Sequence, residues 1–461
     1  MKKYLLFLLL LSIQLSAQCW EKIAVGAHHA IAIKDDGTLW GWGANWHGQL
    51  ARDPAEIAYV TSPVLISDDT SWKNVDCGVH HVIAVKTDGT LWAVGWNDDR
   101  QLGIGQAVEE IYQLTQVGSD NDWNSVFCGW DVSFSIKNNG TLWGWGKNQY
   151  GNLGDGTNST RDTPVQIGTD TDWEIVASGV KHTLAIKTDG TLWAWGKSYD
   201  GALGIGGTGI SEESSPVQCG TDADWKSIIV GTEFSAGLKD DGTIWVWGKS
   251  GYGELGNGDT FSAYYVPTQL GTELWTSISG RYNNVFAIKA NGTLWAWGFN
   301  ENGQLADGTT TNRNIPTFIE SFNDPASIMP SYLFTLALKE DGTLWAWGSN
   351  MLGHYGNGTI LESGEPPGAT PVYIDNCATA TTIDHLKQQF TFYPNPAAAH
   401  LNIVTPENTS IEQITIAGIN GNTILTQTHT SQINVQQLPA GMYFIEIKTD
   451  SGSSHHKFIK E

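Results

Sequence analysis

The sequence predicts an all-β protein: a seven-bladed β-propeller followed by a small Ig-like β-sandwich. A unit of about fifty residues recurs seven times along the chain. The 461 residues include 53 Gly and 22 Trp, a composition that suits many turns and a recurring large packing element. Short alternating strands continue after the last copy. Self-similarity at this period is typical of propellers and other repeat architectures.

The repeat is anchored by the string Asp/Asn-Gly-Thr-Leu/Ile-Trp. Each copy opens with Trp, or with Pro325 in the seventh copy, and passes through a turn, which is Gly-x-x-His in three copies, into a strand that ends in Lys. After the Asp-Gly string comes a Gly-x-Asn-x-x-Gly-Gln-Leu-Gly loop, then a short strand. The Gly of the string recurs every 50 to 52 residues, at Gly37, Gly89, Gly140, Gly190, Gly242, Gly292 and Gly342.

This anatomy predicts four short strands per copy. The Asp-Gly segment favours a tight hairpin, because Gly and Asn tolerate a positive φ. Strand alternation places both Trp residues of Trp-x-Trp on one face of the sheet. One blade cannot bury both of its faces, so neighbouring blades must stack, and a closed ring removes the open edges. We therefore expect the first Trp of each pair to be largely buried between blades, as at Trp143, Trp193, Trp245 and Trp295.

The N-terminus predicts export. Residues 1–18 have the pattern of a signal peptide, with Lys2 and Lys3 before an apolar run and Ala17 at a small-residue cleavage site. A lipidated Cys19 is the alternative, which the bulk of Gln18 disfavours. The apolar run is shorter than the roughly 20 residues of a membrane span, so no transmembrane anchor is expected. A net charge of −23 argues against nucleic acid as a partner.

The pattern of the repeat stops after Cys377. We expect the propeller to span residues 19–377, a polar Thr/Ala-rich linker to span 378–389, and a second domain to span 390–461. In this last segment, alternating strands separated by turns predict the small β-sandwich.

Residues that break the repeat are the candidates for a binding face, because scaffold positions recur and functional positions need not. Aromatic anchors suit protein or glycan recognition. The alternative is that each ring packs on its own blade, and the sequence leaves open which loops share a face. Tyr59, Tyr112, Tyr264 and Tyr265 are expected in the longer loops before the fourth strand. The candidate face comprises Trp46, Trp130, Tyr150, Tyr199, Tyr252, Tyr282 and Tyr332.

Three recurring polar features are expected to be structural. His29, His81 and His182 share one repeat position that carries Val, Phe or Asn in the other copies, which favours packing over metal ligation. The Lys that ends the second strand is expected to be a solvated edge residue. The acidic pairs before the opening Trp are expected to cap turns rather than to bind Ca²⁺; they are Asp68-Asp69, Asp120/Asp122, Asp170/Asp172 and Asp222/Asp224. No catalytic residue, metal or cofactor is expected.

The cysteines predict one disulfide at the seam of the ring. In the register of an intact copy, Cys377 and Cys19 fall two residues apart, which places their Cα atoms within or close to disulfide range. We expect a Cys19–Cys377 bridge that latches the ring. Cys77, Cys128 and Cys219 have no such argument and are expected to be buried thiols.

The repeats resemble those of the regulator of chromosome condensation family in its bacterial form, over roughly residues 20–375. The matching motifs are Gly-x-x-His, Asp-Gly-Thr-Leu-Trp-x-Trp-Gly and Gly-x-Asn-x-x-Gly-Gln-Leu-Gly. The resemblance implies a seven-bladed propeller that acts by binding proteins. The founding member exchanges nucleotide on a small nuclear GTPase, and another propeller of the class inhibits β-lactamases. Because the matching residues are scaffold positions, neither activity is expected here.

The C-terminal segment resembles the type A sorting domain of the type IX secretion system. The match rests on Tyr393-Pro394-Asn395-Pro396, Leu438-Pro439-Ala440-Gly441-Met442-Tyr443 and Lys457-Phe458-Ile459-Lys460. It implies contact with the secretion machinery, passage across the outer membrane, removal of the domain, and release or attachment at the surface.

These features together predict a secreted or surface-displayed recognition propeller without catalytic activity. We expect a monomer whose partner is an unidentified protein or glycan. The alternative is a secreted enzyme, for example a glycan-degrading one, or an enzyme inhibitor that uses one propeller face. Convergent carboxylates in a pocket would favour the enzyme, and a flat face rimmed by aromatic residues would favour binding.

Overall fold

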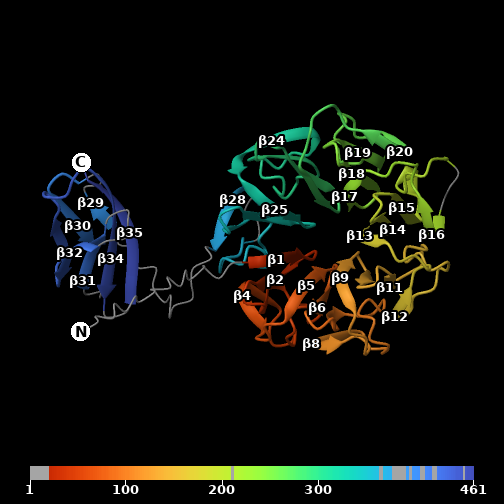
Figure 1. The fold of residues 1–461 in the computed structure, drawn as a ribbon, viewed down its shortest axis with the longest axis horizontal. Helices are drawn as coiled ribbons and strands as arrows, with labels where there is room; N and C mark the ends of the chain where they lie inside the picture. The colour runs from red at the N-terminus through yellow and green to blue at the C-terminus, as the bar shows by residue number, and fades with distance from the viewer. Residues whose placement is uncertain are drawn as a thin grey trace, which may run out of the picture. The chain divides into compact units, whose positions relative to one another are not determined.

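The computed structural model describes residues 20–208, 212–362, 367–375, 391–393, 397–404, 411–417, 423–449 and 452–460. The chain divides into two units, residues 1–379 and 380–461. The first unit is a ring of four-stranded sheets around a central axis (Figure 1). None of the described residues forms a helix that is long and apolar enough to cross a membrane.

Each of the seven blades is an antiparallel sheet with its strands in chain order. Blade 1 comprises β1 (Trp20–Val25), β2 (His29–Lys34), β3 (Leu39–Ala44) and β4 (Tyr59–Ser67), and blade 2 comprises β5 (Trp72–Cys77), β6 (His81–Lys86), β7 (Leu91–Trp96) and β8 (Glu110–Gln116). Blade 3 comprises β9 (Trp123–Cys128), β10 (Val132–Lys137), β11 (Leu142–Gly146) and β12 (Arg161–Gln166), and blade 4 comprises β13 (Trp173–Ser178), β14 (His182–Lys187), β15 (Leu192–Lys197) and β16 (Glu212–Gln218). Blade 5 comprises β17 (Trp225–Val230), β18 (Phe234–Lys239), β19 (Ile244–Lys249) and β20 (Ala263–Gln269), and blade 6 comprises β21 (Ser277–Arg281), β22 (Asn284–Ile288), β23 (Thr293–Gly298) and β24 (Arg313–Asn323). Blade 7 comprises β25 (Pro325–Pro330), β26 (Phe334–Lys339), β27 (Leu344–Gly348) and β28 (Gly368–Asp375).

The Asp-Gly string forms the predicted hairpin, as blade 4 illustrates. Gly190 has φ +78°, and a Cβ there would lie 2.4 Å from the carbonyl oxygen of Ala223, so only Gly fits. The Asp189 carboxylate accepts hydrogen bonds from the Thr191 backbone N–H at 3.0 Å and from its hydroxyl at 2.6 Å. The same hydroxyl accepts the indole N–H of Trp193 at 3.0 Å. The Asp, Gly, Thr and Trp of the string therefore all take part in forming this hairpin.

Blades are joined mainly through the second Trp of each Trp-x-Trp pair. Trp145 is fully buried, and its indole N–H donates to the carbonyl oxygen of Gln101 in the preceding blade at 2.9 Å. Gly103 lets the ring approach, since a Cβ there would lie 2.7 Å from it. Trp42 makes the same bond to His354 at 3.0 Å, which joins blade 1 to blade 7 and closes the ring.

The first Trp of each pair packs between blades as expected, but it is less buried than the second Trp. Trp143, Trp193, Trp245 and Trp295 are half-buried, whereas the second Trp of each pair has 0% exposure, at Trp145, Trp195, Trp247 and Trp297. Both rings do lie on one face, because Trp123 contacts Trp143 at 5.8 Å and Trp145 at 6.4 Å between ring centroids. The first Trp lies nearer the end of the blade, where the neighbouring blade covers only part of it.

The four tyrosines expected in loops before the fourth strand instead lie within that strand. Tyr59 begins β4 and pairs with Ala44, and a register shift lets the strand continue past the bulge to Leu65 opposite Trp40. Tyr112 lies in β8, and Tyr264 and Tyr265 lie in β20. The irregular pairing made the fourth strand longer than the sequence pattern indicated.

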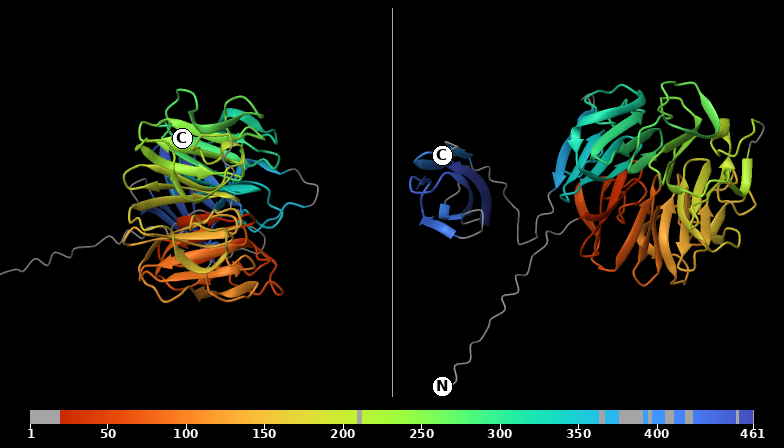
Figure 2. Two further views of the ribbon diagram at one scale, coloured as in Figure 1. Left: turned by 90° about the vertical axis from the view of Figure 1, so that its right-hand side faces the viewer. Right: turned by 45° about the horizontal axis from the view of Figure 1, so that its top comes forward.

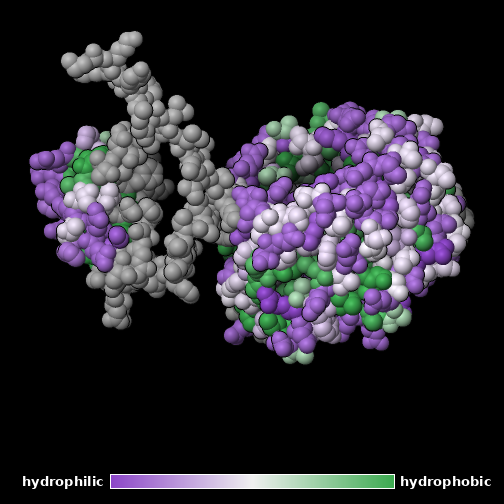
Figure 3. Space-filling view, turned by 60° about the horizontal axis from the view of Figure 1, so that its bottom comes forward, coloured by the Kyte–Doolittle hydropathy of each residue, from purple (hydrophilic) through white to green (hydrophobic). Residues whose placement is uncertain are grey.

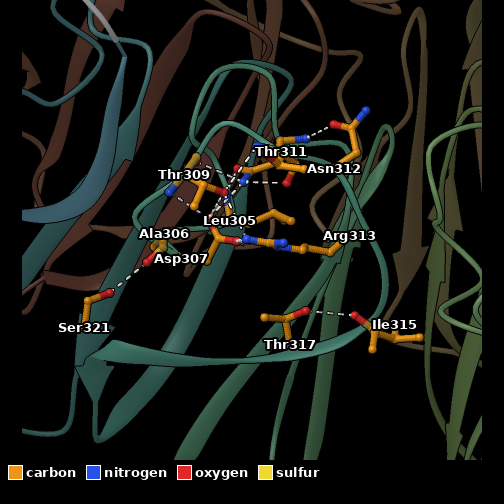
Figure 4. A network of polar contacts seen from close by, with 11 residues as sticks. Leu305, Ala306, Asp307, Thr309, Thr311, Asn312, Arg313, Ile315, Thr317 and Ser321 are labelled. Atoms are coloured by element: carbon orange, nitrogen blue, oxygen red, sulfur yellow. Dashed lines mark hydrogen bonds and ion pairs between the residues drawn. The ribbon is translucent and has the colours of Figure 1, made fainter.

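The loops between the third and fourth strands are held by side-chain hydrogen bonds. In blade 6, Asn300 accepts the backbone N–H of Leu305 at 2.8 Å and donates to Asp307 at 3.0 Å. The same carboxylate accepts the Thr309 N–H at 3.0 Å and the Arg313 Nε–H at 2.5 Å (Figure 4). Leu305 is fully buried, so the Gly-x-Asn-x-x-Gly-Gln-Leu loop is an ordered platform.

The second unit contains two antiparallel sheets around one apolar core. The first sheet comprises β29 (Thr391–Tyr393), β30 (His400–Val404) and β33 (Gln432–Asn434); the second comprises β32 (Thr423–Thr428), β31 (Ile411–Ala417), β34 (Gly441–Thr449) and β35 (Gly452–Lys460). Leu401, Ile403, Ile414, Ile416 and Ile445 lie in the shared core.

Candidate recognition face

Antiparallel topology settles which loops share a face. In every blade the turn between the first two strands and the loop between the last two lie at the same end of the sheet. We call this end of the propeller the Gly-turn face, and the opposite end, which carries the Asp-Gly hairpins and the acidic loops, the hairpin face; Figure 2 shows the strands running between them. All seven candidate aromatic residues lie on the Gly-turn face: Trp46, Trp130, Tyr150, Tyr199, Tyr252, Tyr282 and Tyr332.

Three of these residues meet at the centre of the Gly-turn face. The ring centroid of Tyr282 lies 5.5 Å from that of Trp130 and 5.5 Å from that of Tyr332. Tyr282 is buried, Trp130 is half-buried and Tyr332 is 42% exposed. Ala27 and Val79 complete the apolar cluster. We call Trp130, Tyr282 and Tyr332 the axial aromatic cluster.

The other candidates lie further out. Tyr150 packs under the Lys181 ammonium, which lies 5.9 Å from the ring centroid. Tyr252 is 42% exposed and contacts Phe299 at 4.9 Å. Tyr199 begins the short 3₁₀ helix η1 (Tyr199–Gly201), and its side chain lies outside the described residues.

Arg281 closes the axis beneath the axial aromatic cluster. The first strands of all seven blades surround this axis. Arg281 occupies the Gly position of the Gly-x-x-His turn, and its guanidinium donates to the carbonyl oxygens of Val25 at 2.7 Å, Cys77 at 2.7 Å and Cys128 at 3.2 Å. A cavity of about 330 Å³ lies along the axis beside it.

Asp76 is the carboxylate that lines this cavity with Arg281. Its oxygens accept the backbone N–H groups of Cys77 at 2.8 Å and Cys128 at 2.7 Å. Burial raises the pKa of Asp76, and the Arg281 charge opposes that shift. The sequence analysis missed both residues, because it searched the repeat-breaking positions for aromatic residues alone. An Arg where other copies carry Gly26, Gly78, Gly129, Gly179 or Gly231 was a visible exception.

A second aromatic group lies near the seam of the ring. His28 lies 5.2 Å from Trp46 and 5.9 Å from His80 between ring centroids. His47 lies 4.8 Å from His80 and 3.9 Å from Trp96. We call these five residues, which come from blades 1 and 2, the His–Trp patch. Of these five residues, only Trp46 belonged to the predicted face. The adjacent histidine pairs His28-His29 and His80-His81 were the sequence feature that could have indicated the patch.

Blades 3 to 5 carry charged residues at the corresponding positions. Lys147 lies 2.9 Å from Asp99 and 3.5 Å from Asp131. Burial raises the pKa of Asp131 to about 6, and Lys147 opposes the shift. Lys249 lies 3.2 Å from Asp200. The Gly-turn face is therefore divided into an aromatic sector without lysine and a sector of lysine–carboxylate pairs.

The repeat Lys is not the solvated edge residue that the sequence analysis expected. The Lys137 side chain is 9% exposed, and its ammonium lies 4.5 and 4.6 Å from the ring centroids of Trp123 and Trp143. It also contacts Asp120 at 2.6 Å and Asp122 at 2.9 Å. Burial lowers the pKa of Lys137, but these two carboxylates outweigh it and raise the pKa overall. The two indole rings exclude water while their faces attract the cation, which explains the burial.

The same contacts explain the acidic loops. Lys187 pairs with Asp170 and Asp172, and Lys239 pairs with Asp222 and Asp224, as Lys86 does with Asp69. In the part of the chain that the structure describes, no cluster of His, Cys, Asp or Glu is arranged to hold a metal ion. These carboxylates complete the packing between the Lys and the Trp pair.

The three repeat histidines are packing residues. His29, His81 and His182 are buried, and the last two contact Ser133 and Ser235 of the next blade at 2.9 and 2.8 Å. Burial lowers the pKa of His182 to about 4 and that of His81 to about 3. Cys77, Cys128 and Cys219 are buried free thiols, as expected.

Hollows lined by apolar residues also mark the outside of the propeller (Figure 3). A cavity of about 400 Å³ between blades 5 and 6 is lined by Leu270, Trp275, Lys289, Trp295 and Ile315. Its Trp and Lys residues stand at repeat positions, with Lys289 between the two rings at 5.0 and 4.2 Å. This hollow is thus a feature of the scaffold rather than a departure from it.

The fold and the face together define a closed repeat propeller. The family model described as "Regulator of chromosome condensation (RCC1) repeat" matches residues 36–85, 139–186, 189–238, 241–287 and 291–338. The chain belongs to this family. A second model, "Secretion system C-terminal sorting domain", matches residues 391–461. This sorting domain implies interaction with the type IX secretion machinery and export to the exterior or outer surface of the cell.

Similarity to individual proteins covers part of the chain. The ultraviolet-B receptor UVR8 of Arabidopsis thaliana is 31% identical over 147 residues, which are 32% of this chain and 33% of that protein. The human regulator of chromosome condensation is 25% identical over 143 residues, 31% of this chain and 34% of that protein. The aligned segments thus span about a third of these relatives' lengths.

Two solved structures share the fold. Human WBSCR16 has a TM-score of 0.64 at 22% identity, over 70% of this chain and 88% of that one. Prp20p from Saccharomyces cerevisiae has a TM-score of 0.63 at 18% identity, over 78% of this chain and 88% of that one. These matches agree with the seven-bladed architecture.

Proposed function

We propose that this protein is a secreted recognition propeller without catalytic activity, which binds a macromolecular ligand through its Gly-turn face. One observation carries the proposal: the seven aromatic residues that break the repeat in its Gly-x-x-His turns and in the loops between the third and fourth strands stand together at this end of the blades. Trp46, Tyr252 and Tyr332 are each 41 to 42% exposed there. Exposed, rigidly held aromatic rings supply much of the energy of binding surfaces.

The support beneath this face favours binding. The Asn and Asp side chains that hold the loops cross-link them internally, so a ligand would not have to order them. The similar proteins include an ultraviolet-B receptor and a regulator of chromosome condensation. A propeller that serves such different tasks is best explained as a scaffold whose loops carry the specificity.

The enzyme alternative has less support. Asp76 and Arg281 line the axial cavity, but both Asp76 oxygens accept backbone N–H groups and the guanidinium nitrogens donate to backbone carbonyls. Groups held this way serve the structure. A general acid or base needs access to a substrate proton.

The test is a binding survey of the purified full-length chain on protein and glycan arrays. Replacing Trp46 and Tyr332 together with Ala should weaken capture of the ligand at least about tenfold. Leu274→Ala, which removes a 60% exposed side chain from the hairpin face, should leave capture unchanged. Equal losses in the two variants would contradict the assignment of the face, and shortening of an arrayed glycan would favour the enzyme.

A further inference from the structure

The His–Trp patch combines exposed aromatic area with polar ring atoms. Trp46 is 41% exposed, and His28, His47, His80 and Trp96 are half-buried around it. Neighbouring rings lie at mixed inclinations: His28 and His80 are nearly parallel at 13°, and Trp46 is inclined to His28 by 52°. The patch therefore offers several ring faces within one continuous surface.

The patch is anchored from below by blade 7. The buried ring of His354 lies 5.9 Å from His28 and stacks on Phe334 at 4.7 Å, with 2° between the ring planes. His354 Nδ1 donates to the carbonyl oxygen of Ser349 at 2.9 Å. The position of His28 thus depends on the closed ring, because residues 28 and 354 meet only at the seam.

Burial disfavours the charged form of two of the patch histidines, His28 and His80. Burial lowers the pKa of His28, and it lowers the pKa of His80 to about 3 with help from His47 and His28. Nδ1 of both rings is buried without a hydrogen-bond partner among the described residues. Nε2 of each ring is therefore the nitrogen that remains for a hydrogen bond with a ligand.

Glu110 supplies an acceptor at the edge of the patch. Its carboxylate lies 3.2 Å from His47 Nδ1 and accepts the Tyr112 hydroxyl at 2.6 Å. The rings and this carboxylate together provide apolar faces, N–H donors and oxygen acceptors side by side. Among the described residues, no lysine or arginine forms an ion pair or a cation–π contact with the five rings.

We propose that the His–Trp patch is a binding site for a neutral saccharide. The inference rests on the proposed function and specifies the ligand class of one sector of the Gly-turn face. The C–H faces of a sugar carry slight positive charge and pack on the negative face of an indole. Its hydroxyl groups both donate and accept, which matches the imidazole N–H groups and the Glu110 carboxylate.

Charge argues against an anionic glycan. The chain carries a net charge of −23, and the lysines of the Gly-turn face at blades 3 and 5 are already paired with carboxylates. A polyanion would be repelled at long range and would find no free cation in the patch. A neutral polysaccharide is not repelled and does not need a cation in the patch.

The test compares three full-length variants in calorimetric titrations and array binding. Trp46→Ala removes the most exposed ring, and His80→Phe keeps a ring but removes its hydrogen-bonding nitrogens. Leu274→Ala is the control, because Leu274 is 60% exposed on the hairpin face, outside the proposed binding surface. The probes are laminarin, mannan, xylan and cello-oligosaccharides as neutral glycans, and alginate and polygalacturonate as anionic glycans.

We expect the wild type and Leu274→Ala to bind at least one neutral glycan equally and not to bind the anionic ones. Trp46→Ala and His80→Phe should each weaken that binding at least about tenfold, while their thermal unfolding temperatures stay at the control value. Neutral-glycan binding that survives both patch variants overturns the inference.

A different outcome separates the two proposals. If the array shows a protein ligand that Trp46→Ala weakens, and no glycan binds, the saccharide inference fails while the proposed function stands. If a ligand is found whose capture is unaffected by loss of Trp46, Tyr252 and Tyr332, the Gly-turn face is not the binding surface and both proposals fail.

Discussion

The guanidinium of Arg281 in blade 6 donates a 2.7 Å hydrogen bond to the carbonyl oxygen of Cys77 in blade 2. The side chain reaches across the axis, and its bonds to Val25 and Cys128 join it to blades 1 and 3 as well. One residue that breaks the repeat therefore ties four blades together at the centre of the ring.

Arg281→Gly restores the residue that most copies carry at this position, yet it should destabilise the propeller. The change leaves three carbonyl oxygens without their donor and leaves Asp76 buried without the compensating charge. Removing one member of a buried charged pair costs about 3–5 kcal/mol. Chemical denaturation of the full chain would measure the loss.

A double-mutant cycle isolates the part of that loss that comes from charge. Asp76→Ala reproduces the residue found at Ala24 and Ala177, and combined with Arg281→Gly it should cost less than the two single changes added together. Strict additivity would show that the two residues act independently.

The second Trp of each pair should contribute more to stability than the first. Trp145→Ala removes a fully buried ring and should cost about 3–5 kcal/mol. Trp143→Ala removes a half-buried ring and should cost roughly half as much, in proportion to the area lost. Urea unfolding of both variants decides the order, and a larger loss at Trp143 would contradict the packing described above.

Lys137→Met should destabilise the propeller even though it keeps the aliphatic stem. It removes the cation from between Trp123 and Trp143 and leaves Asp120 and Asp122 facing each other unpaired. We expect a loss of about 1–3 kcal/mol, measured by thermal and urea unfolding. Lys73→Met is the control, since Lys73 is exposed and forms a hydrogen bond to Asn124 alone among the described contacts. An equally large loss of unfolding free energy in Lys73→Met would show that the repeat Lys has no special role.

Buried histidines should make the propeller sensitive to acid. The pKa of His182 is about 4 in the folded protein, against an ordinary value of 6.5. Between these values the unfolded chain binds a proton that the folded chain does not, so stability is full above pH 6.5 and falls as the pH drops towards 4. This one residue accounts for up to about 3 kcal/mol of that fall.

His182→Phe tests this linkage with a residue that the repeat itself uses, at Phe234 and Phe334. The variant should show a flatter dependence of unfolding free energy on pH between 6.5 and 4, and adding His81→Phe should flatten it further. The measurement is urea unfolding across that pH range. An unchanged slope in the double variant would show that these histidines do not drive the acid response.

The Cys19–Cys377 disulfide stays a prediction, because both residues lie outside the described part of the chain. By the chain-entropy model, a bridge that closes so long a loop adds roughly 5–6 kcal/mol as an upper value. Mass mapping of the non-reduced mature protein should find the linked peptides. A free thiol or a lipid on Cys19 would rule the bridge out.

Much of this architecture is visible in the sequence by itself. The seven Asp/Asn-Gly-Thr strings determine the number of blades, and each string contains the residues that build its own hairpin, as Asp189 and Thr191 show. Contacts between residues two to five positions apart can form without the rest of the chain. The C-terminal unit was visible for the same reason, since its strands alternate locally.

The tertiary structure decided everything that depends on one blade meeting another. Whether a Lys is solvated depends on two indole rings and an acidic loop, so the sequence analysis misplaced Lys137. The His–Trp patch requires residue 28 to meet residues 80 and 354, and the axial closure requires Arg281 to reach Cys77. These distances arise only when the ring closes, because the repeat specifies each blade while closure specifies which unlike residues become neighbours.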